Sequence, residues 1–395
     1  MSTGAALAAV LGLSPAPEVG KQSLEGAFDG APALVWERDL PGPLVQAAKH
    51  VELGAPLIDG DEVLLGGVGQ DGLFVLDRYS GTHIHTYPSM GSVQSQPRVD
   101  GDAIVFTDTA GYTFRYQRGE SEPEWKHYGG APIVSSPLLD DGVVYVSNVA
   151  GTVYGLDKGD GALRWRYVHE KDVARSVALE LYGAPSPVSH EGNVLVGFHD
   201  GTLVALSKEL GERKWQRSVG EGRYTDLIGR PTIVGDDVIV TGFSSPLLSI
   251  KLDSRNVRWR IDTGGATDVV VADGTGFHGG SDGKLLAFDL VNGSTEWSWE
   301  APKDGALTSP LITEAGVFIG TNTGGLYLLD QETGEETWRY VAGKSIAGFT
   351  AGMHSQGRQL VAVTNSGRVL SFVHVDDQES FVTGVGELPK ELGNE

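Results

Sequence analysis

Two groups of residues in this chain have types and spacings that could carry chemistry. The first is Gly67-Val-Gly-Gln-Asp-Gly72, which has the glycine spacing of dinucleotide-binding loops. Such a loop needs a strand before the glycines and a helix after them, because the helix N-terminus faces the pyrophosphate. Here a β-type apolar stretch follows at residues 73–76. The motif therefore predicts a turn between two strands and no nucleotide site.

The second group consists of histidines and aspartates. His83 and His85 stand on one face of a predicted strand and could hold a metal ion, but no carboxylates cluster near them, which favours a core or interface role. Two aspartate pairs fall in predicted hairpin turns, where Asp bonds its own backbone: Asp140 with Asp141, and Asp236 with Asp237. General acid–base work needs such groups to converge in a dry pocket, which turns at a rim do not predict. We expect no catalytic residue, no metal and no cofactor.

The elements that position these residues belong to a repeat. In residues 151–167 two short predicted strands flank a turn that ends at Gly161, a residue that supplies the positive φ of such turns, and Trp165 follows four residues later. Equivalent third strands begin about 40 residues apart along the chain, at eight places. Two further short strands precede each of them. Four short strands at this period, joined by glycine turns, are typical of propeller blades.

The repeat predicts an all-β protein, an eight-bladed β-propeller of four-stranded antiparallel blades. The eighth repeat lacks its outer strand, while residues 33–39 form a spare outer strand at the other end of the array. We therefore expect the N-terminal strand to close the last blade and to cover its edge. One aromatic residue per repeat is predicted to dock against the next blade: Trp36, Trp125, Trp165, Trp215, Trp259, Trp297 and Trp338, with His85 in the first blade.

Composition narrows the range of partners. The chain has 395 residues and a net charge of −22, which argues against nucleic acids and anionic membranes as partners. It contains no cysteine, so disulfides and thiolate zinc sites are excluded. We divide it into a leader (1–30), the propeller (31–375) and an acidic tail (376–395). The apolar run at 5–13 is too short to span a bilayer. With no Lys or Arg before it, the run is either an atypical export signal or a disordered leader.

Two crossings between blades depart from the repeat. The interval between Gly151 and Gly201 widens to about 50 residues, which places extra residues at 169–182, and the next crossing is 221–230. Strand order puts both crossings on one rim, opposite the short glycine turns. Several apolar side chains there have no obvious blade role and predict a binding surface: Val177, Leu179, Leu181, Leu227 and Ile228. The alternative is that they fold back over the tops of the blades.

The recurring Asp, turn Gly and Trp resemble the PQQ-type propeller repeat over residues 33–373. Length, blade number and closure resemble the BamB-like branch, periplasmic scaffolds of the outer-membrane β-barrel assembly machinery that bind the POTRA region of BamA. The resemblance implies partner contacts at Leu179, Leu181 and Tyr182 in the first crossing, and at Asp226 and Ile228 in the second. The family has arginine at the position of Tyr182 and aspartate at that of Ile228. Its lipid-modified cysteine has no counterpart here.

The expected function is a non-enzymatic periplasmic scaffold, monomeric within a complex and without direct membrane insertion. Two alternatives stay open. One is an extracytoplasmic sensor or adhesin. The other is a quinoprotein dehydrogenase, whose family holds pyrroloquinoline quinone and calcium over the propeller. Those enzymes resemble this chain less, because they are much longer and use an adjacent-cysteine pair that is missing here.

Overall fold

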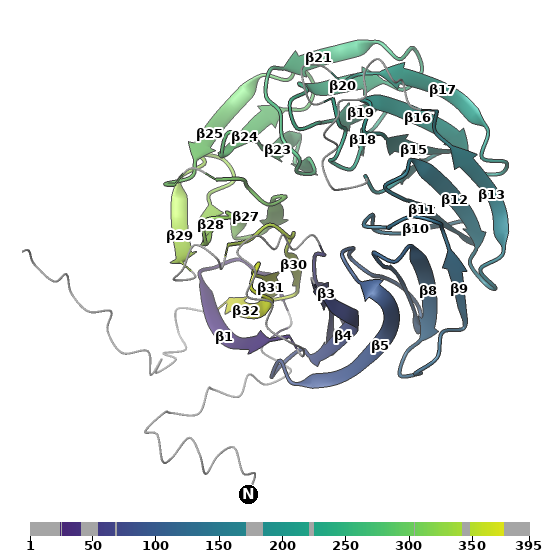
Figure 1. The fold of residues 1–395 in the computed structure, drawn as a ribbon. Helices are drawn as coiled ribbons and strands as arrows, with labels where there is room; N and C mark the ends of the chain where they lie inside the picture. Colours follow the sequence, from purple (N-terminus) through teal and green to yellow (C-terminus); the bar gives the residue numbers. More distant parts are fainter. Residues whose placement is uncertain are drawn as a thin grey trace, which may run out of the picture.

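The computed structural model describes residues 24, 26–40, 54–67, 69–170, 185–220, 225–303, 305–341 and 348–374. Within these residues the chain forms 32 strands, β1 to β32, in eight four-stranded antiparallel sheets. Figure 1 shows the sheets arranged as blades around a ring. The predicted all-β, eight-bladed propeller is confirmed.

The strands follow chain order within each blade. Blades 1 and 2 consist of β2 (Leu57–Asp59), β3 (Glu62–Gly67), β4 (Gln70–Asp77), β5 (His83–Ser92), β6 (Arg98–Asp100), β7 (Ala103–Thr107), β8 (Tyr112–Gln117) and β9 (Trp125–Tyr128). Blades 3 and 4 consist of β10 (Leu138–Asp140), β11 (Val143–Ser147), β12 (Thr152–Asp157), β13 (Leu163–Val168), β14 (Val188–His190), β15 (Asn193–Gly197), β16 (Thr202–Ser207) and β17 (Arg213–Ser218). Blades 5 and 6 consist of β18 (Thr232–Val234), β19 (Asp237–Val240), β20 (Leu247–Lys251), β21 (Val257–Ile261), β22 (Val270–Ala272), β23 (Thr275–Gly279), β24 (Lys284–Asp289) and β25 (Thr295–Glu300). Blades 7 and 8 consist of β26 (Leu311–Thr313), β27 (Gly316–Gly320), β28 (Gly325–Leu329), β29 (Glu336–Val341), β30 (His354–Gln356), β31 (Gln359–Val363), β32 (Arg368–His374) and the N-terminal β1 (Pro32–Asp39).

The N-terminal strand closes the ring. In blade 8 the strand order is β1-β32-β31-β30, and β1 pairs antiparallel with β32 from Pro32↔His374 to Asp39↔Arg368. In Figure 1 the purple β1 lies beside the yellow β32. This pairing confirms the predicted closure. It satisfies the outer edge of β32, whose backbone groups would otherwise be open to pairing with another chain.

A short segment before β1 packs on the same blades. Leu24 and Phe28 are both 3% exposed, and the Phe28 ring packs edge-on against Phe318 at 5.4 Å. The backbone also contributes, since Ala315 N donates to Phe28 O at 2.7 Å. The packing of the propeller thus includes residues that the sequence assigned to the leader. Residues 1–23 and the tail from 375 lie outside the described residues.

The inner and outer strands of a blade differ in burial for a simple geometric reason. The middle strands are covered on both faces by the neighbouring blades, so β11 is an unbroken buried run, whereas the outer β13 alternates. The three-residue inner strands, such as β10, are half-buried where they face the channel. Each inter-blade space holds its own apolar cluster. The core is therefore a ring of clusters, as the chain's many short apolar runs require.

Five of the predicted docking tryptophans lie on the third turn of the next blade. Trp165 Nε1 donates to Lys208 O at 2.8 Å, and its ring covers Gly211, where an added Cβ would come within 2.5 Å of the indole. Gly211 has φ of +68°, so the turn needs glycine for its backbone as well as for space. The same donation to the next blade occurs at four other tryptophans: Trp36, Trp125, Trp259 and Trp297.

Three of the predicted docking positions differ. Trp215 is partly buried and makes no such donation among the described residues. Trp338 packs against Phe372 of blade 8, with the ring planes at 82°. His85 occupies the register position of the tryptophans in blade 1, opposite Val75 and directly after a bulge like the one that precedes Trp165. Its ring packs on Tyr87 at 4.6 Å.

The glycine motif at residues 67–72 falls in the β3–β4 hairpin, where Gly67 pairs with Gln70, as the sequence predicted. No helix among the described residues has the length and apolar character needed to cross a bilayer.

Candidate functional site

The turn between β15 and β16 lies between the two unusual crossings. The first crossing runs from the end of β13 at Val168 to the start of β14 at Val188, and the second joins β17 to β18. In a four-stranded antiparallel blade, the second turn and the outgoing crossing share one rim. Residues 198–201, the second turn of blade 4, are therefore placed to touch both crossings.

The first crossing is anchored to this turn through His169. His169 Nε2 lies 2.8 Å from Asp200 Oδ2, and the two side chains are only 4% and 2% exposed. The His169 ring also stacks on Phe198, with 4.0 Å between ring centroids and planes at 16°. The crossing thus leaves blade 3 from a fixed, buried point.

The second crossing is anchored to the neighbouring residues of the same turn. His199 Nδ1 lies 2.9 Å from Asp226 Oδ1, again with both side chains buried. The backbone adds to this contact, since Leu227 N donates to Phe198 O at 3.2 Å. Three consecutive turn residues therefore bind the ends of both crossings.

The crossing residues suggested by the resemblance are only partly described. Leu179, Leu181 and Tyr182, together with Val177, lie outside the described residues. Asp226 is described and is 2% exposed, because its carboxylate is held by His199. Ile228, two residues further on, is half-buried. Of these two residues, only Ile228 presents side-chain surface at this rim.

The expectation that Leu227 has no blade role is wrong. Leu227 is 2% exposed and packs in the cluster between blades 4 and 5, and its backbone forms an isolated bridge with Gly242. It stands four residues before Pro231, as Val93 stands before Pro97 and Ile133 before Pro137, and both of those residues are buried. The spacing of an apolar residue to the proline that precedes the next blade would have identified it as core.

The anchoring turn itself was missed from the sequence. Phe198 is the first residue of its turn, and the equivalent turns begin with Asp108, Asn148 or Thr364. All four turns end in a glycine three residues after their first residue. In the other three turns the polar side chain bonds the turn backbone, as Asn148 Oδ1 does with Thr152 N at 2.9 Å. At residues 198–201 the sequence Phe-His-Asp-Gly replaces that polar first residue by phenylalanine, and this departure from the repeat could have identified the anchoring turn.

A cavity at the central channel is a second candidate site. The cavity of about 300 Å³ is lined by residues at and just before the starts of the inner strands, including Arg98, Arg230 and Asp268. Burial, and then the nearby Arg230 charge, lower the pKa of Arg98 to about 10. The rest of the cavity wall is uncharged, and some of its serines link neighbouring blades, as Ser186 Oγ does by accepting from Ser136 N at 2.9 Å. These contacts give the residues a role in holding the ring together.

The histidine pair on β5 has separate contacts. His83 Nε2 lies 2.8 Å from Thr86 Oγ1 on an exposed face, whereas His85 points into the space between blades 1 and 2. Within the described ranges, no three His, Asp or Glu side chains gather as a metal site would require.

A model of a known protein family matches most of the propeller. The family described as outer membrane protein assembly factor BamB matches residues 89–299 and 297–379. The BamB of Legionella pneumophila is 25% identical over 197 residues, 48% of this chain and 50% of that protein. The BamB of Burkholderia pseudomallei is 29% identical over 258 residues, 63% of this chain and 65% of that protein. The chain spans about half the length of the first curated relatives that it matches.

Solved structures show the same fold. The crystal structure of BamB from Moraxella catarrhalis superposes with a TM-score of 0.72 at 19% identity, covering 87% of this chain and all of that one. A quinohemoprotein alcohol dehydrogenase from Pseudomonas putida superposes with a TM-score of 0.66 at 13% identity, covering 91% of this chain and 78% of that one. At these identities the likeness concerns the fold alone.

Proposed function

The chain belongs to the family of the outer membrane protein assembly factor BamB, and we propose that it is a non-enzymatic scaffold in outer-membrane protein assembly. In this proposal it works in the periplasm and binds a BamA-like protein, at the POTRA region, through the two crossings. Leu179, Leu181 and Tyr182 supply contacts from the first crossing, and Ile228 supplies an apolar contact from the second.

The observation that carries the proposal is the shared anchor of the two crossings. The His169–Asp200 contact fixes the start of the first crossing to one turn of blade 4, and the His199–Asp226 contact fixes the end of the second crossing to the same turn. Loops held at buried roots lose less conformational entropy when a partner binds, which favours affinity. Asp226 contributes by holding the second crossing in place and not by direct contact.

The proposal is tested by pull-down of a BamA homologue with Leu181→Glu and Ile228→Glu, singly and together. Each places a charge on an apolar contact, and the double variant should lose capture while its melting temperature stays within a few degrees of the wild type. Val291→Glu is the matched control. Val291 is apolar and 67% exposed, but it lies in the β24–β25 turn on the opposite rim.

Capture of the BamA homologue by the double variant at wild-type level would overturn the proposed surface. Loss of capture in the Val291→Glu control as well would point to a general effect of added negative charge, and would equally contradict a role specific to the crossings.

A further inference from the structure

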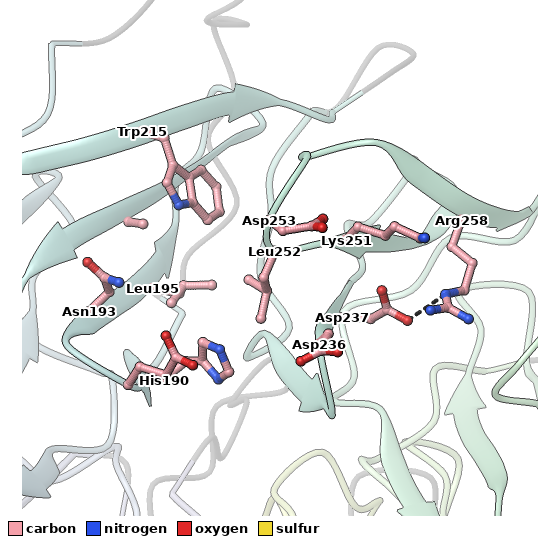
Figure 2. A pocket seen from close by; sticks show the side chains of 12 residues that line it. His190, Asn193, Leu195, Trp215, Asp236, Asp237, Lys251, Leu252, Asp253 and Arg258 are labelled. Carbon is pink, nitrogen blue, oxygen red and sulfur yellow. Dashed lines mark ion pairs between the residues drawn. The ribbon is translucent and has the colours of Figure 1, made fainter.

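The interface between blades 4 and 5, on the rim opposite the crossings, contains a cavity that the scaffold role does not use. Its volume is about 400 Å³. Figure 2 shows its walls, with Trp215 from β17 on one side and Asp237 and Arg258 from blade 5 on the other. Leu195 and Leu252 supply apolar surface between them. We propose that this cavity binds a guanidinium or alkylammonium group.

The cavity exists because one turn departs from the repeat. Arg255 takes the position that glycine holds in the turns under the other docked tryptophans, and it has φ of +62°. At the equivalent Gly161 and Gly293, an added Cβ would come within 2.6 and 2.8 Å of the docked indole. The Cβ of Arg255 therefore keeps Trp215 from docking. A strained non-glycine residue that opens an interface is a feature often found at binding sites.

Trp215 accordingly differs from the docked tryptophans. The donation of Nε1 to the second residue of the next turn, made by Trp165 to Lys208 O at 2.8 Å, has no counterpart for Trp215 among the described residues. Its ring is partly buried, as is that of the docked Trp297, so the missing donation is what sets Trp215 apart. An accessible indole face attracts cations through its ring quadrupole.

A buried carboxylate oxygen in the cavity wall supplies a second, independent observation. Asp237 is 7% exposed, and its Oδ2 forms an ion pair with Arg258 Nε at 2.6 Å. Its other oxygen, Oδ1, is buried and has no hydrogen-bond partner in the part of the chain that the structure describes. A buried acceptor left unsatisfied is costly, and a donor from a bound ligand would remove that cost.

In three other interfaces a cation fills this place, whereas Leu290 stands there between blades 5 and 6 and Gln331 between blades 6 and 7. In those three interfaces the second residue of the third turn carries a cation that reaches back to the first hairpin of the preceding blade. Lys158 Nζ lies 2.8 Å from Asp100 Oδ2, and Lys208 Nζ lies 2.5 Å from Asp140 Oδ2. In the closing interface, Arg78 donates to Gln359 Oε1 at 2.7 Å and to the carbonyl of Gln356.

Between blades 4 and 5 the corresponding residue is Leu252, so the chain supplies no cation there from this position. The remaining charged residues of the wall leave an acidic balance: Glu191, Asp236, Asp237 and Asp253 against Lys251 and Arg258. His190 stands where Asp100 and Asp140 stand in their own hairpins, so an external cation opposite Leu252 would have Asp237 of blade 5 as its acceptor. The cation could come from a basic side chain of a protein segment or from a free polyamine.

The test titrates the full-length protein and follows the indole N–H resonance of Trp215 by NMR, assigned with Trp215→Phe. The probes are Nα-acetyl-arginine amide, its uncharged isostere Nα-acetyl-citrulline amide, and spermidine. We expect the arginine probe or spermidine to shift the resonance in a saturable way and the citrulline probe to have little effect. A tighter response to the arginine probe identifies a basic side chain as the ligand, and a tighter response to spermidine identifies a polyamine.

Two variants separate binding from folding. Asp237→Asn should weaken binding of the cationic probes at least about tenfold, because it removes the charge on the buried acceptor. Arg255→Gly should let Trp215 dock, so it should abolish binding while raising the melting temperature, a combination that unfolding cannot produce. Equal shifts with the citrulline probe, saturable binding retained by Arg255→Gly, or no shift with either cation at tens of millimolar would each overturn the proposal.

Discussion

His199 Nδ1 lies 2.9 Å from Asp226 Oδ1, joining a turn of blade 4 to the end of the crossing that enters blade 5. The contact is hidden from solvent, and it places a charged residue of the crossing inside the rim. The neighbouring His169–Asp200 contact does the same for the preceding crossing. Two buried histidine–aspartate contacts thus fix the ends of both crossings to the same turn.

Removing this anchor should cost both stability and partner capture. We expect Asp226→Ala to lower the free energy of unfolding by about 1–3 kcal/mol, because it leaves His199 buried without its acceptor. Capture of a BamA homologue should fall with it, since Ile228 follows directly. Asp262→Ala is the control, because the Asp262 side chain is 79% exposed and such changes stay within about 0.5 kcal/mol. Urea midpoints that do not separate the two variants would contradict the anchoring role.

The docked and undocked tryptophans should differ in their contribution to stability. Trp165→Ala should destabilise by about 3–5 kcal/mol, the range for truncating a buried aromatic side chain. Trp215→Ala should cost clearly less, because its ring is only partly buried and Nε1 lacks the bond to the next blade. Melting temperatures of the two variants, measured side by side, check this order. Equal losses would show that Trp215 docks in solution.

Ring closure predicts a specific failure on truncation. Deletion of residues 1–39 removes β1 and exposes the edge of β32, so the protein should lose melting temperature and form aggregates at micromolar concentration. Deletion of residues 1–23 keeps β1 together with Leu24 and Phe28, and it should behave as the full chain in light scattering. Monodisperse protein from the longer deletion would contradict closure by β1.

Buried histidines predict a loss of stability in mild acid. His278 is fully buried, and burial lowers its pKa to about 4 from the ordinary value of 6.5. The unfolded chain therefore takes up the proton first as pH falls. The stabilisation from neutral His278 is complete above pH 6.5 and is lost as pH falls toward 4, a change of roughly 3 kcal/mol at most.

The pKa of His354 is also lowered to about 4, mainly by burial, and it adds to the same pH window. Denaturant midpoints between pH 7 and pH 4 should therefore decline in the wild type. They should decline less steeply in His278→Gln, which removes one titrating group. An unchanged slope in the variant would rule out His278 as a source of the acid sensitivity.

The architecture could be predicted from the sequence because the same short sequence pattern recurs in most blades. A turn glycine with positive φ, such as Gly161, and a tryptophan four residues later mark the third and fourth strands wherever they occur. Even closure could be predicted, because an unpaired outer strand at one end of the array matched a missing one at the other. Local turn chemistry and strand period carry this information.

The candidate site could be predicted only in outline. Loop length located the two crossings, but the interpretation of Leu227 as surface was wrong, since it fills the apolar place that Val93 and Ile133 fill elsewhere. The resemblance suggested Asp226 as a contact, yet its burial depends on His199, which lies in another blade element 27 residues away.

The sequence by itself determined the number of blades and their order, because these depend on contacts between residues close in the chain and on a regular period. It also determined the closing strand, because a spare outer strand at one end of the array matches the one missing at the other. Only the tertiary structure decided which polar residues are buried and which interface stays open. Those outcomes depend on the packing of separate blades. The Cβ of Arg255 matters because Trp215, 40 residues earlier in the preceding blade, would otherwise occupy its space.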